Sequence, residues 1–170
     1  MKNLSKLIRE IPDFPKKGIL FRDITPLLSD GKAFREVIEI FKNQCPEGIE
    51  KVVAVESRGF IFGSCLAYSL GVGFVPVRKA GKLPYKTLRV EYDLEYGKDV
   101  LEMHEDGISK GEKVVVVDDL LATGGTALAC CQLVEKCGGK VEKILFLIEL
   151  AELKGIEKLK GYDVFSILKL

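Results

Sequence analysis

Apolar residues gather in five short runs of strand length along the chain. Several runs are consecutive β-branched residues without polar interruption, as at 114–117. Such unbroken runs are typical of strands buried on both faces of a parallel sheet, because strict alternation marks a strand with one solvated face. The pattern predicts strands at residues 52–55, 74–77, 114–117, 144–148 and 164–168.

Between these runs, apolar residues recur at helical spacing. One stretch follows Asp30 with apolar residues at positions 34, 37, 38 and 41; a second spans 60–70; a third covers 127–137 and stops at Gly138. Alternating strands and helices predict an α/β fold in which a central, mostly parallel sheet is flanked by helices on both faces. Ligands of such folds bind beyond the carboxyl ends of the strands.

Two segments do not follow the alternation. Residues 11–28 contain Pro12, Pro15 and Pro26, so we expect an irregular segment that lies over one end of the sheet. Residues 79–99 are charged and punctuated by glycine, and a long excursion inside a compact domain is usually functional. We expect a hairpin or lid there.

Composition and charge narrow the class of protein. A length of 170 residues indicates one domain, and 47% hydrophobic with 30% charged residues excludes disorder. The net charge of +1 gives no general attraction to nucleic acid or anionic membranes. No apolar run is long enough to span a bilayer, and the N-terminus lacks a signal peptide, so the expected location is cytoplasmic.

Residues 114–126 predict a phosphate-binding loop. A buried strand ends in the acids Asp118 and Asp119, and a turn of small residues then opens a helix. Glycines let backbone approach an anion, and the N-terminus of a helix favours negative charge. The predicted phosphate-binding residues are Ala122, Thr123, Gly124, Gly125 and Thr126.

The two acids limit which phosphate compound fits. Adjacent carboxylates would repel a phosphate unless they face ribose hydroxyls or a divalent cation, so a ribose phosphate satisfies both halves. Neither a Walker loop nor a G-x-G-x-x-G pattern occurs, which argues against ATPase and dinucleotide-binding proteins. The alternative is a tight turn with a capping threonine and no ligand.

This segment resembles the ribose-phosphate signature of the type I phosphoribosyltransferases. Further stretches resemble the adenine-specific branch of that family: Asp13-Phe14-Pro15, residues 18–28, Glu56-Ser57-Arg58-Gly59-Phe60, Arg78-Lys79 with Gly81-Lys82-Leu83-Pro84, and Leu94-Glu95-Tyr96-Gly97. Glu56 stands where some relatives have aspartate. The resemblance implies one domain over residues 1–170, with an N-terminal hood at 1–30 and a flexible flap at 79–99.

The resemblance also implies an activity. The family transfers a phosphoribosyl group from 5-phosphoribosyl 1-pyrophosphate to N9 of adenine, giving AMP and pyrophosphate, with Mg²⁺ and as a homodimer. The ion would come with the substrate and lie near Asp118 and Asp119, the acids at the ribose hydroxyls, without a direct ligand assigned in the chain.

Roles carry over to residues that match the family's stretches. Residues expected at the pyrophosphate are Glu56, Ser57, Arg58, Lys79 and Lys82. Those expected at adenine are Leu20, Phe21, Arg22 and Leu150. On the flap, Glu95 would act in proton transfer and Tyr96 would shield the site; Arg58 and Glu95 are the catalytic candidates.

Alternatives remain for the function and for individual residues. The chain could use another nucleobase, or it could be a regulator of the same fold that senses a nucleotide and binds nucleic acid, which would need a basic face. Arg58 could be a surface arginine, Phe21 a core residue, and Glu95 competes with Glu91, Asp93 and Asp99 as a flap acid. His104 and the five cysteines are expected to be structural.

Overall fold

The computed structural model describes residues 4–93 and 98–170. Within these residues, seven strands form the main sheet in the order β5-β6-β4-β3-β7-β8-β9, and β1 pairs with β2 in a separate hairpin. The strands of the main sheet are β3 (Lys51–Val55), β4 (Gly73–Lys79), β5 (Thr87–Asp93), β6 (Lys98–His104), β7 (Lys113–Leu121), β8 (Lys140–Glu149) and β9 (Val164–Lys169). The neighbouring strands β4-β3-β7-β8-β9 run parallel to one another, whereas β6 is antiparallel to both of its neighbours, β4 and β5.

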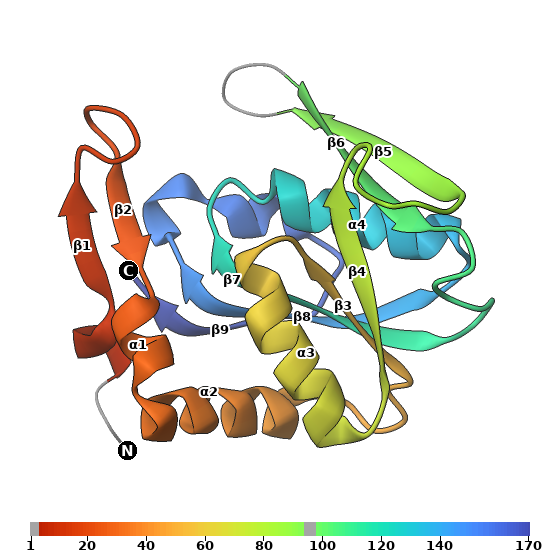
Figure 1. Ribbon diagram of the computed structural model, residues 1–170, viewed down its shortest axis with the longest axis horizontal. Helices are drawn as coiled ribbons and strands as arrows, with labels where there is room; N and C mark the ends of the chain where they lie inside the picture. Colours follow the sequence, from red (N-terminus) through yellow and green to blue (C-terminus); the bar gives the residue numbers. More distant parts are fainter. Residues whose placement is uncertain (1–3, 94–97) are drawn as a thin grey trace.

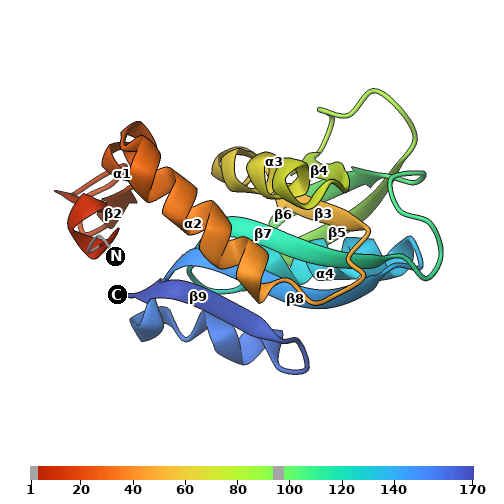
Figure 2. The ribbon, with the colours of Figure 1, turned by 90° about the horizontal axis from the view of Figure 1, so that it is seen from below.

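Helices cover both faces of this sheet, as predicted. They are α1 (Thr25–Ser29), α2 (Gly31–Gln44), α3 (Arg58–Leu70) and α4 (Gly125–Lys136), with short 3-10 turns η1 (Leu4–Leu7), η2 (Ala151–Leu153) and η3 (Gly155–Leu159). Figure 1 shows the arrangement, and Figure 2 shows α2 and α3 together on one face. Asp30 starts α2, because its Oδ1 accepts hydrogen bonds from the backbone N–H groups of Lys32 and Ala33 at 3.0 and 3.1 Å.

Two apolar cores form on opposite faces of the same strands. Val53 and Val116 point toward α4 and pack with Val134, whereas Val52 and Val115 point toward α2 and α3. Because successive residues of a strand face opposite sides, a strand covered on both sides needs apolar residues at every position. This explains the unbroken valine runs, and all five predicted strands are confirmed.

The N-terminal segment is more regular than its prolines suggest. The strands β1 (Arg9–Pro12) and β2 (Leu20–Asp23) form an N-terminal hairpin, followed directly by α1, so the expectation of an irregular segment over 11–28 is wrong in part. Pro12 sits at the last position of β1 and Pro15 lies in the connecting turn, where proline does not interrupt the strand ladder. The hairpin lies beyond the carboxyl ends of β7, β8 and β9 (Figure 1).

The second unusual segment is a hairpin, as expected. β5 and β6 pair in antiparallel register from Thr87 with His104 to Asp93 with Lys98, and β6 continues the main sheet beside β4. We call this β5–β6 hairpin the arm. Residues 94–97, at the turn of the arm, lie outside the described part of the chain.

The cysteines and the single histidine have ordinary structural surroundings. Burial raises the pKa of the Cys45 thiol to about 11 and that of Cys131 to about 12. His104 ends β6, and its ring meets the Tyr85 ring edge-on at 5.9 Å. Among the described residues, no helix combines the length and the apolar composition needed to cross a membrane.

Candidate active site

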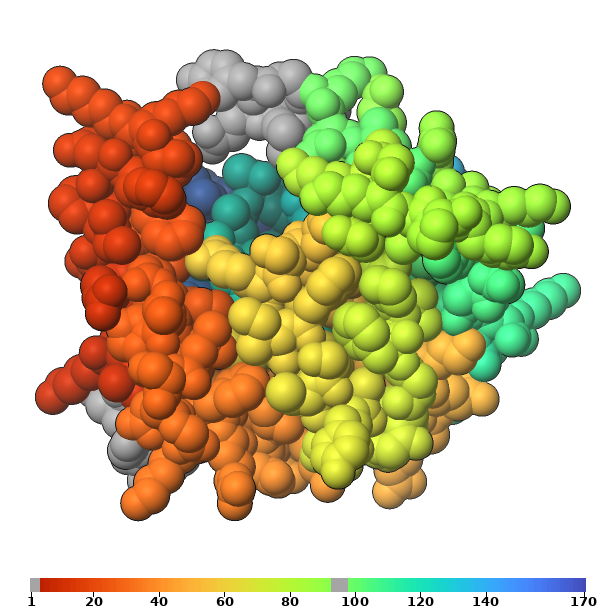
Figure 3. Space-filling view, in the orientation of Figure 1, coloured from red at the N-terminus to blue at the C-terminus, as the bar shows by residue number. Residues whose placement is uncertain are grey.

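A cavity of about 470 Å³ opens where β3, β4 and β7 end. It is the hollow in Figure 3 between the red N-terminal hairpin and the green arm, with teal atoms of the segment after β7 at its floor. The fold therefore brings together most of the predicted site. The predicted residues that line the cavity are Glu56, Ser57, Arg58, Lys79, Asp118, Asp119, Ala122, Thr123, Gly124, Gly125 and Thr126.

The floor of the cavity is residues 122–126, which we call the phosphate loop. Gly124 has a φ of +82°, a left-handed conformation that side chains rarely adopt, and α4 begins at the next residue. The first N–H groups of a helix have no partner within the helix, and together with its dipole they favour a bound anion. The loop thus has the geometry of a site for one phosphate group.

The acid pair stands beside the phosphate loop at the end of β7. Asp119 is only 5% exposed, and its Oδ2 lies 2.8 Å from Nη2 of Arg58. Oδ1 of Asp118 accepts a hydrogen bond from the backbone N–H of Asp119 at 2.8 Å. Gly59 allows this close packing, since a Cβ at that position would lie 2.8 Å from Oδ1 of Asp118.

Burial makes ionisation of these acids unfavourable. Burial, and then the charge of Asp119, raise the pKa of Asp118 well above its ordinary value. Burial also raises the pKa of Asp119, although the Arg58 guanidinium acts in the opposite direction. Two adjacent carboxyl groups of this kind are suited to bind hydroxyl groups or to share a cation. Without such a partner, their ionisation lowers the free energy of unfolding of the protein.

Asp118→Asn should therefore stabilise the protein at pH 8. A carboxyl whose folded pKa is raised favours folding most at low pH and loses that contribution as the pH rises through the folded pKa. We expect a gain of about 1 kcal/mol, or about 2 to 4 °C in Tm, which shrinks near pH 5. Thermal unfolding at both pH values tests this, with exposed Asp106→Asn as the control. A variant that gains nothing at pH 8 would contradict the electrostatic account.

Arg58 connects the acid pair to the N-terminal hairpin. It is the first residue of α3, and its Nη1 donates to the carbonyl oxygen of Arg22 at 3.1 Å while Nη2 pairs with Asp119. Its guanidinium also lies over the ring of Phe21, 5.0 Å from the ring centre. One cation thus connects the acid pair to the N-terminal hairpin.

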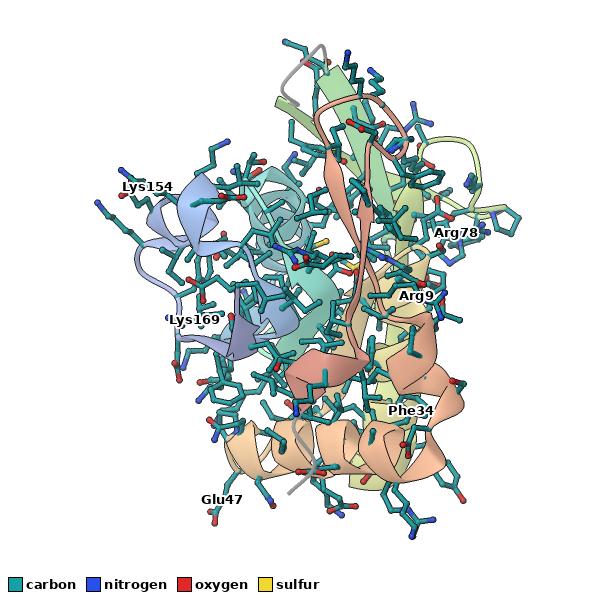
Figure 4. All side chains as sticks on the ribbon, turned by 90° about the vertical axis from the view of Figure 1, so that its left-hand side faces the viewer. Arg9, Phe34, Glu47, Arg78, Lys154 and Lys169 are labelled. Atoms are coloured by element: carbon teal, nitrogen blue, oxygen red, sulfur yellow. The ribbon has the colours of Figure 1, made fainter. Side chains whose placement is uncertain are left out.

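A second group of cations surrounds Glu56, whose side chain is 8% exposed. Oε2 of Glu56 lies 2.9 Å from Nη2 of Arg78, and Oε1 lies 3.1 Å from Nζ of Lys82. Oε1 also accepts the backbone N–H of Lys79 at 2.8 Å. Burial opposes ionisation of Glu56, but these hydrogen bonds outweigh it and lower its pKa. We call residues 78–82 the cation loop; Arg78 is labelled in Figure 4.

Three residues of this region were absent from the predicted site. Arg78 pairs with Glu56 beside the cavity, and Tyr92 and Asp99 of the arm line the cavity itself. Oδ2 of Asp99 lies 2.9 Å from Nζ of Lys79 and accepts from the Tyr92 hydroxyl at 3.4 Å. Adjacency to Lys79 could have pointed to Arg78, whereas Tyr92 and Asp99 face each other only through the register of the arm.

The residues expected at adenine lie outside the walls of this cavity. The ring of Phe21 contacts the guanidinium of Arg58, which lines the cavity. The same ring meets the Phe14 ring edge-on, with the ring centres 5.1 Å apart. Leu150 is partly buried, and its N–H donates to the carbonyl oxygen of Leu121 at 2.9 Å. Leu20, the first residue of β2, is 42% exposed. Glu95 and Tyr96 lie outside the described residues.

The carboxylates suit a magnesium ion that also binds substrate. Among the described residues, no group of three or more His, Cys, Asp or Glu side chains could hold a metal ion. Asp118 and Asp119 supply two hard oxygen ligands, and Mg²⁺ in proteins often binds one or two carboxylates together with substrate phosphates. The donor set therefore fits an ion that arrives with a phosphate compound.

The sheet, the phosphate loop and the acid pair together define the phosphoribosyltransferase class, and a family model described as "Phosphoribosyl transferase domain" matches residues 30–168. Relatives named adenine phosphoribosyltransferase include those of Christiangramia forsetii, 58% identical over 98% of both chains, and Caldanaerobacter subterraneus subsp. tengcongensis, 57% identical over 99% of this chain and 98% of the relative. The chain belongs to the adenine phosphoribosyltransferase family.

Solved structures agree with this assignment. The adenine phosphoribosyltransferase of Thermoanaerobacter pseudethanolicus superposes with a TM-score of 0.95 at 56% identity, covering 98% of each chain. The Saccharomyces cerevisiae enzyme, in complex with an imino-altritol bisphosphate and adenine, superposes with a TM-score of 0.90 at 42% identity over 96% of this chain and 95% of that one. The predicted fold class is confirmed.

Proposed function

We propose that this protein transfers the phosphoribosyl group of 5-phosphoribosyl 1-pyrophosphate to N9 of adenine, which forms AMP and pyrophosphate for purine salvage. The observation that carries this proposal is that the phosphate loop, the buried acid pair and the cations Arg58 and Lys79 all line the same cavity. Such a cavity fits a ligand with a phosphate at one end, hydroxyls in the middle and further phosphates at the other end.

Each group of residues has one task in the proposed reaction. The phosphate loop binds the 5′-phosphate, and Asp118 and Asp119 bind the ribose hydroxyls. The pyrophosphate is bound by Ser57, Arg58, Lys79 and Lys82. Glu56 holds Lys79 and Lys82 in place. The bond from C1′ to the pyrophosphate oxygen breaks and its electron pair leaves with pyrophosphate, while N9 of adenine bonds to C1′ and gives up its proton. Cations near the leaving group stabilise the charge that develops there.

The base is proposed to bind beside the N-terminal hairpin. Phe21 offers a ring on which a flat purine stacks, and backbone groups of Leu20 and Arg22 lie next to its edge. Leu150 packs on the opposite side of the base. The Arg58 guanidinium now over the Phe21 ring links this region to the cavity. The Saccharomyces structure was solved with adenine and the Giardia lamblia structure with 9-deazaadenine.

The flap and the hood complete the proposed site. Glu95 accepts the proton that N9 of adenine gives up, and Tyr96 shields the reacting atoms from water. We assign residues 79–99 as a flexible flap and 1–30 as a hood within one domain of 170 residues. Lys79, Tyr92 and Asp99 line the cavity, and the N-terminal hairpin contacts Arg58 at its wall.

Magnesium is proposed as the cofactor, near Asp118 and Asp119. When bound, it neutralises phosphate charge and stabilises the leaving pyrophosphate. We further propose a homodimer, supported by the outward face of α3, where Tyr68 is 90% exposed beside Ile61 and Cys65. A cytoplasmic location is consistent with five cysteines present as thiols.

A magnesium-dependent assay of the purified protein tests the function. The protein is mixed with 5-phosphoribosyl 1-pyrophosphate and, separately, adenine, guanine, hypoxanthine or orotate, and nucleotide formation is followed. We expect AMP from adenine and no nucleotide from the other bases. Turnover of another base would overturn the adenine site, and binding without turnover of any base would favour a regulator of the same fold.

A further inference from the structure

The phosphate loop rests on the backbone of another segment, which enters the fold long after the loop itself. Behind residues 122–126 lies η3 (Gly155–Leu159), which begins at the buried Gly155. The same connection meets the end of β7 a second time, where the N–H of Leu150 donates to the carbonyl oxygen of Leu121. The segment after β8 therefore supports the segment after β7.

The contact between Gly155 and the phosphate loop leaves no room for a side chain. A Cβ on Gly155 would lie 2.1 Å from the carbonyl oxygen of Ala122 and 2.9 Å from the backbone nitrogen of Gly124. In the opposite direction, a Cβ on Gly124 would lie 2.4 Å from the carbonyl oxygen of Gly155. All of these neighbours are backbone atoms, so a substitution can be accommodated only by moving one segment away from the other.

Space, and not backbone conformation, explains the glycine at position 155. Gly124 has a positive φ, but Gly155 has a φ outside the left-handed region, so other residues could adopt its backbone angles. The sequence pattern around Gly155 gives it no role in ligand binding. Its lack of a side chain matters only because the phosphate loop lies against it.

We propose that Gly155 is a positioning residue for the 5′-phosphate. By contacting Ala122 and Gly124 from behind, it sets how far the phosphate loop advances into the cavity and where its N–H groups point. This proposal rests on the proposed function of the loop and adds a residue to it. In Figure 4, Lys154, next to Gly155, and Arg78 lie on opposite sides of the N-terminal hairpin, and Gly155 contacts Ala122 and Gly124, so we expect the effect at the phosphate end.

Gly155→Ala tests the proposal. The added methyl group pushes the phosphate loop forward, and a misplacement of about 1 Å can lower a catalytic rate by about 100-fold. We expect affinity for ribose 5-phosphate, measured by calorimetric titration, to fall by about tenfold or more. Affinity for pyrophosphate, bound by the cation loop, should stay within about twofold of the wild-type value.

Gly139→Ala is the matched control for destabilisation. Gly139 immediately precedes β8 and lies away from the cavity. A Cβ at this position would lie 2.7 Å from Cγ2 of Ile108, so the substitution strains the fold without touching the phosphate loop. Its ribose 5-phosphate affinity should equal that of the wild type. Equal losses of ribose 5-phosphate affinity in both variants would show that Gly155 matters only for stability and would overturn the proposal.

A second variant covers the case in which Gly155→Ala does not fold. Leu159 anchors η3 and is 1% exposed, so Leu159→Ala loosens the support behind the loop without adding atoms. Ribose 5-phosphate affinity should fall more than pyrophosphate affinity; equal affinities for both ligands in this variant and the wild type would refute the proposal. The wild-type assay judges the reaction separately, because these titrations need no turnover.

Discussion

Arg58→Ala should lower kcat/KM for 5-phosphoribosyl 1-pyrophosphate by about 100- to 1000-fold, the range expected when one group that stabilises developing charge is removed from an active site. Arg58 makes three contacts: Asp119 at 2.8 Å, the carbonyl oxygen of Arg22 at 3.1 Å and the ring of Phe21. The variant loses the cation at the proposed leaving group and leaves Asp119 buried without its partner.

Steady-state kinetics and pyrophosphate titration measure this effect. We expect kcat to fall as well as the affinity for pyrophosphate, since the charge is needed most as pyrophosphate leaves. Arg35→Ala, which removes an exposed arginine of α2, is the control and should behave as the wild type. An Arg58→Ala enzyme with unchanged pyrophosphate affinity and turnover would remove this residue from the mechanism.

Asp119→Asn tests whether Arg58 acts as part of a pair. If the two side chains work together, the loss in the double variant will be smaller than the product of the two single losses. Independent effects would instead multiply. The result separates the proposed binding of pyrophosphate by Arg58 from its effect on Asp119, the acid proposed to bind ribose.

Glu56→Gln should lower kcat/KM by about 10- to 100-fold, mainly through a higher KM for 5-phosphoribosyl 1-pyrophosphate. The glutamate holds three parts of the cation loop, namely Arg78, the N–H of Lys79 and Lys82. Glutamine retains the size but not the charge, so the two cations lose their shared partner. Hydrogen bonds to charged groups contribute about 1.5 to 3 kcal/mol each, so the free energy of unfolding should also fall by about 2 kcal/mol.

The pH dependence of Glu56 has the opposite sign to that of the acid pair. Because its folded pKa is lowered, its charge stabilises the fold above the pKa of the unfolded chain, and this contribution is lost as the pH falls through the folded pKa. The Tm difference between wild type and Glu56→Gln should therefore be largest near neutral pH and smallest in acid. Glu47→Gln, a change at an exposed residue in the turn after α2, is the control (Figure 4).

Pyrophosphate titration of Glu56→Gln distinguishes two roles of the carboxylate. As an anchor, its loss lets the cation loop move and weakens binding. As a competitor for Arg78 and Lys82, its loss would free both cations and strengthen binding. We expect weaker binding, because a second carboxylate also fixes the loop: Glu102, 1% exposed, accepts the N–H of Gly81 at 3.0 Å. Tighter binding would contradict the anchoring role.

Short-range patterns along the chain predict part of the fold and part of the candidate site. Unbroken valine runs require burial on both faces, so they predicted the parallel strands. The order of acids, glycines and threonines at residues 118–126 predicted a phosphate loop, because its chemistry is carried by backbone N–H groups at one helix start. The resemblance to the family rests on similar continuous stretches, and the fold class and the family are confirmed.

Tertiary structure alone decided which distant residues meet at this site. The strands on either side of the proline-rich turn were missed, because proline at a strand end removes no ladder hydrogen bond. Asp99 faces Tyr92 and Lys79 through strand register, and Gly155 meets Gly124 through a connection from a different strand. These contacts arise from chain crossings and register. A linear pattern does not encode them, since each side chain or glycine looks ordinary in its own segment.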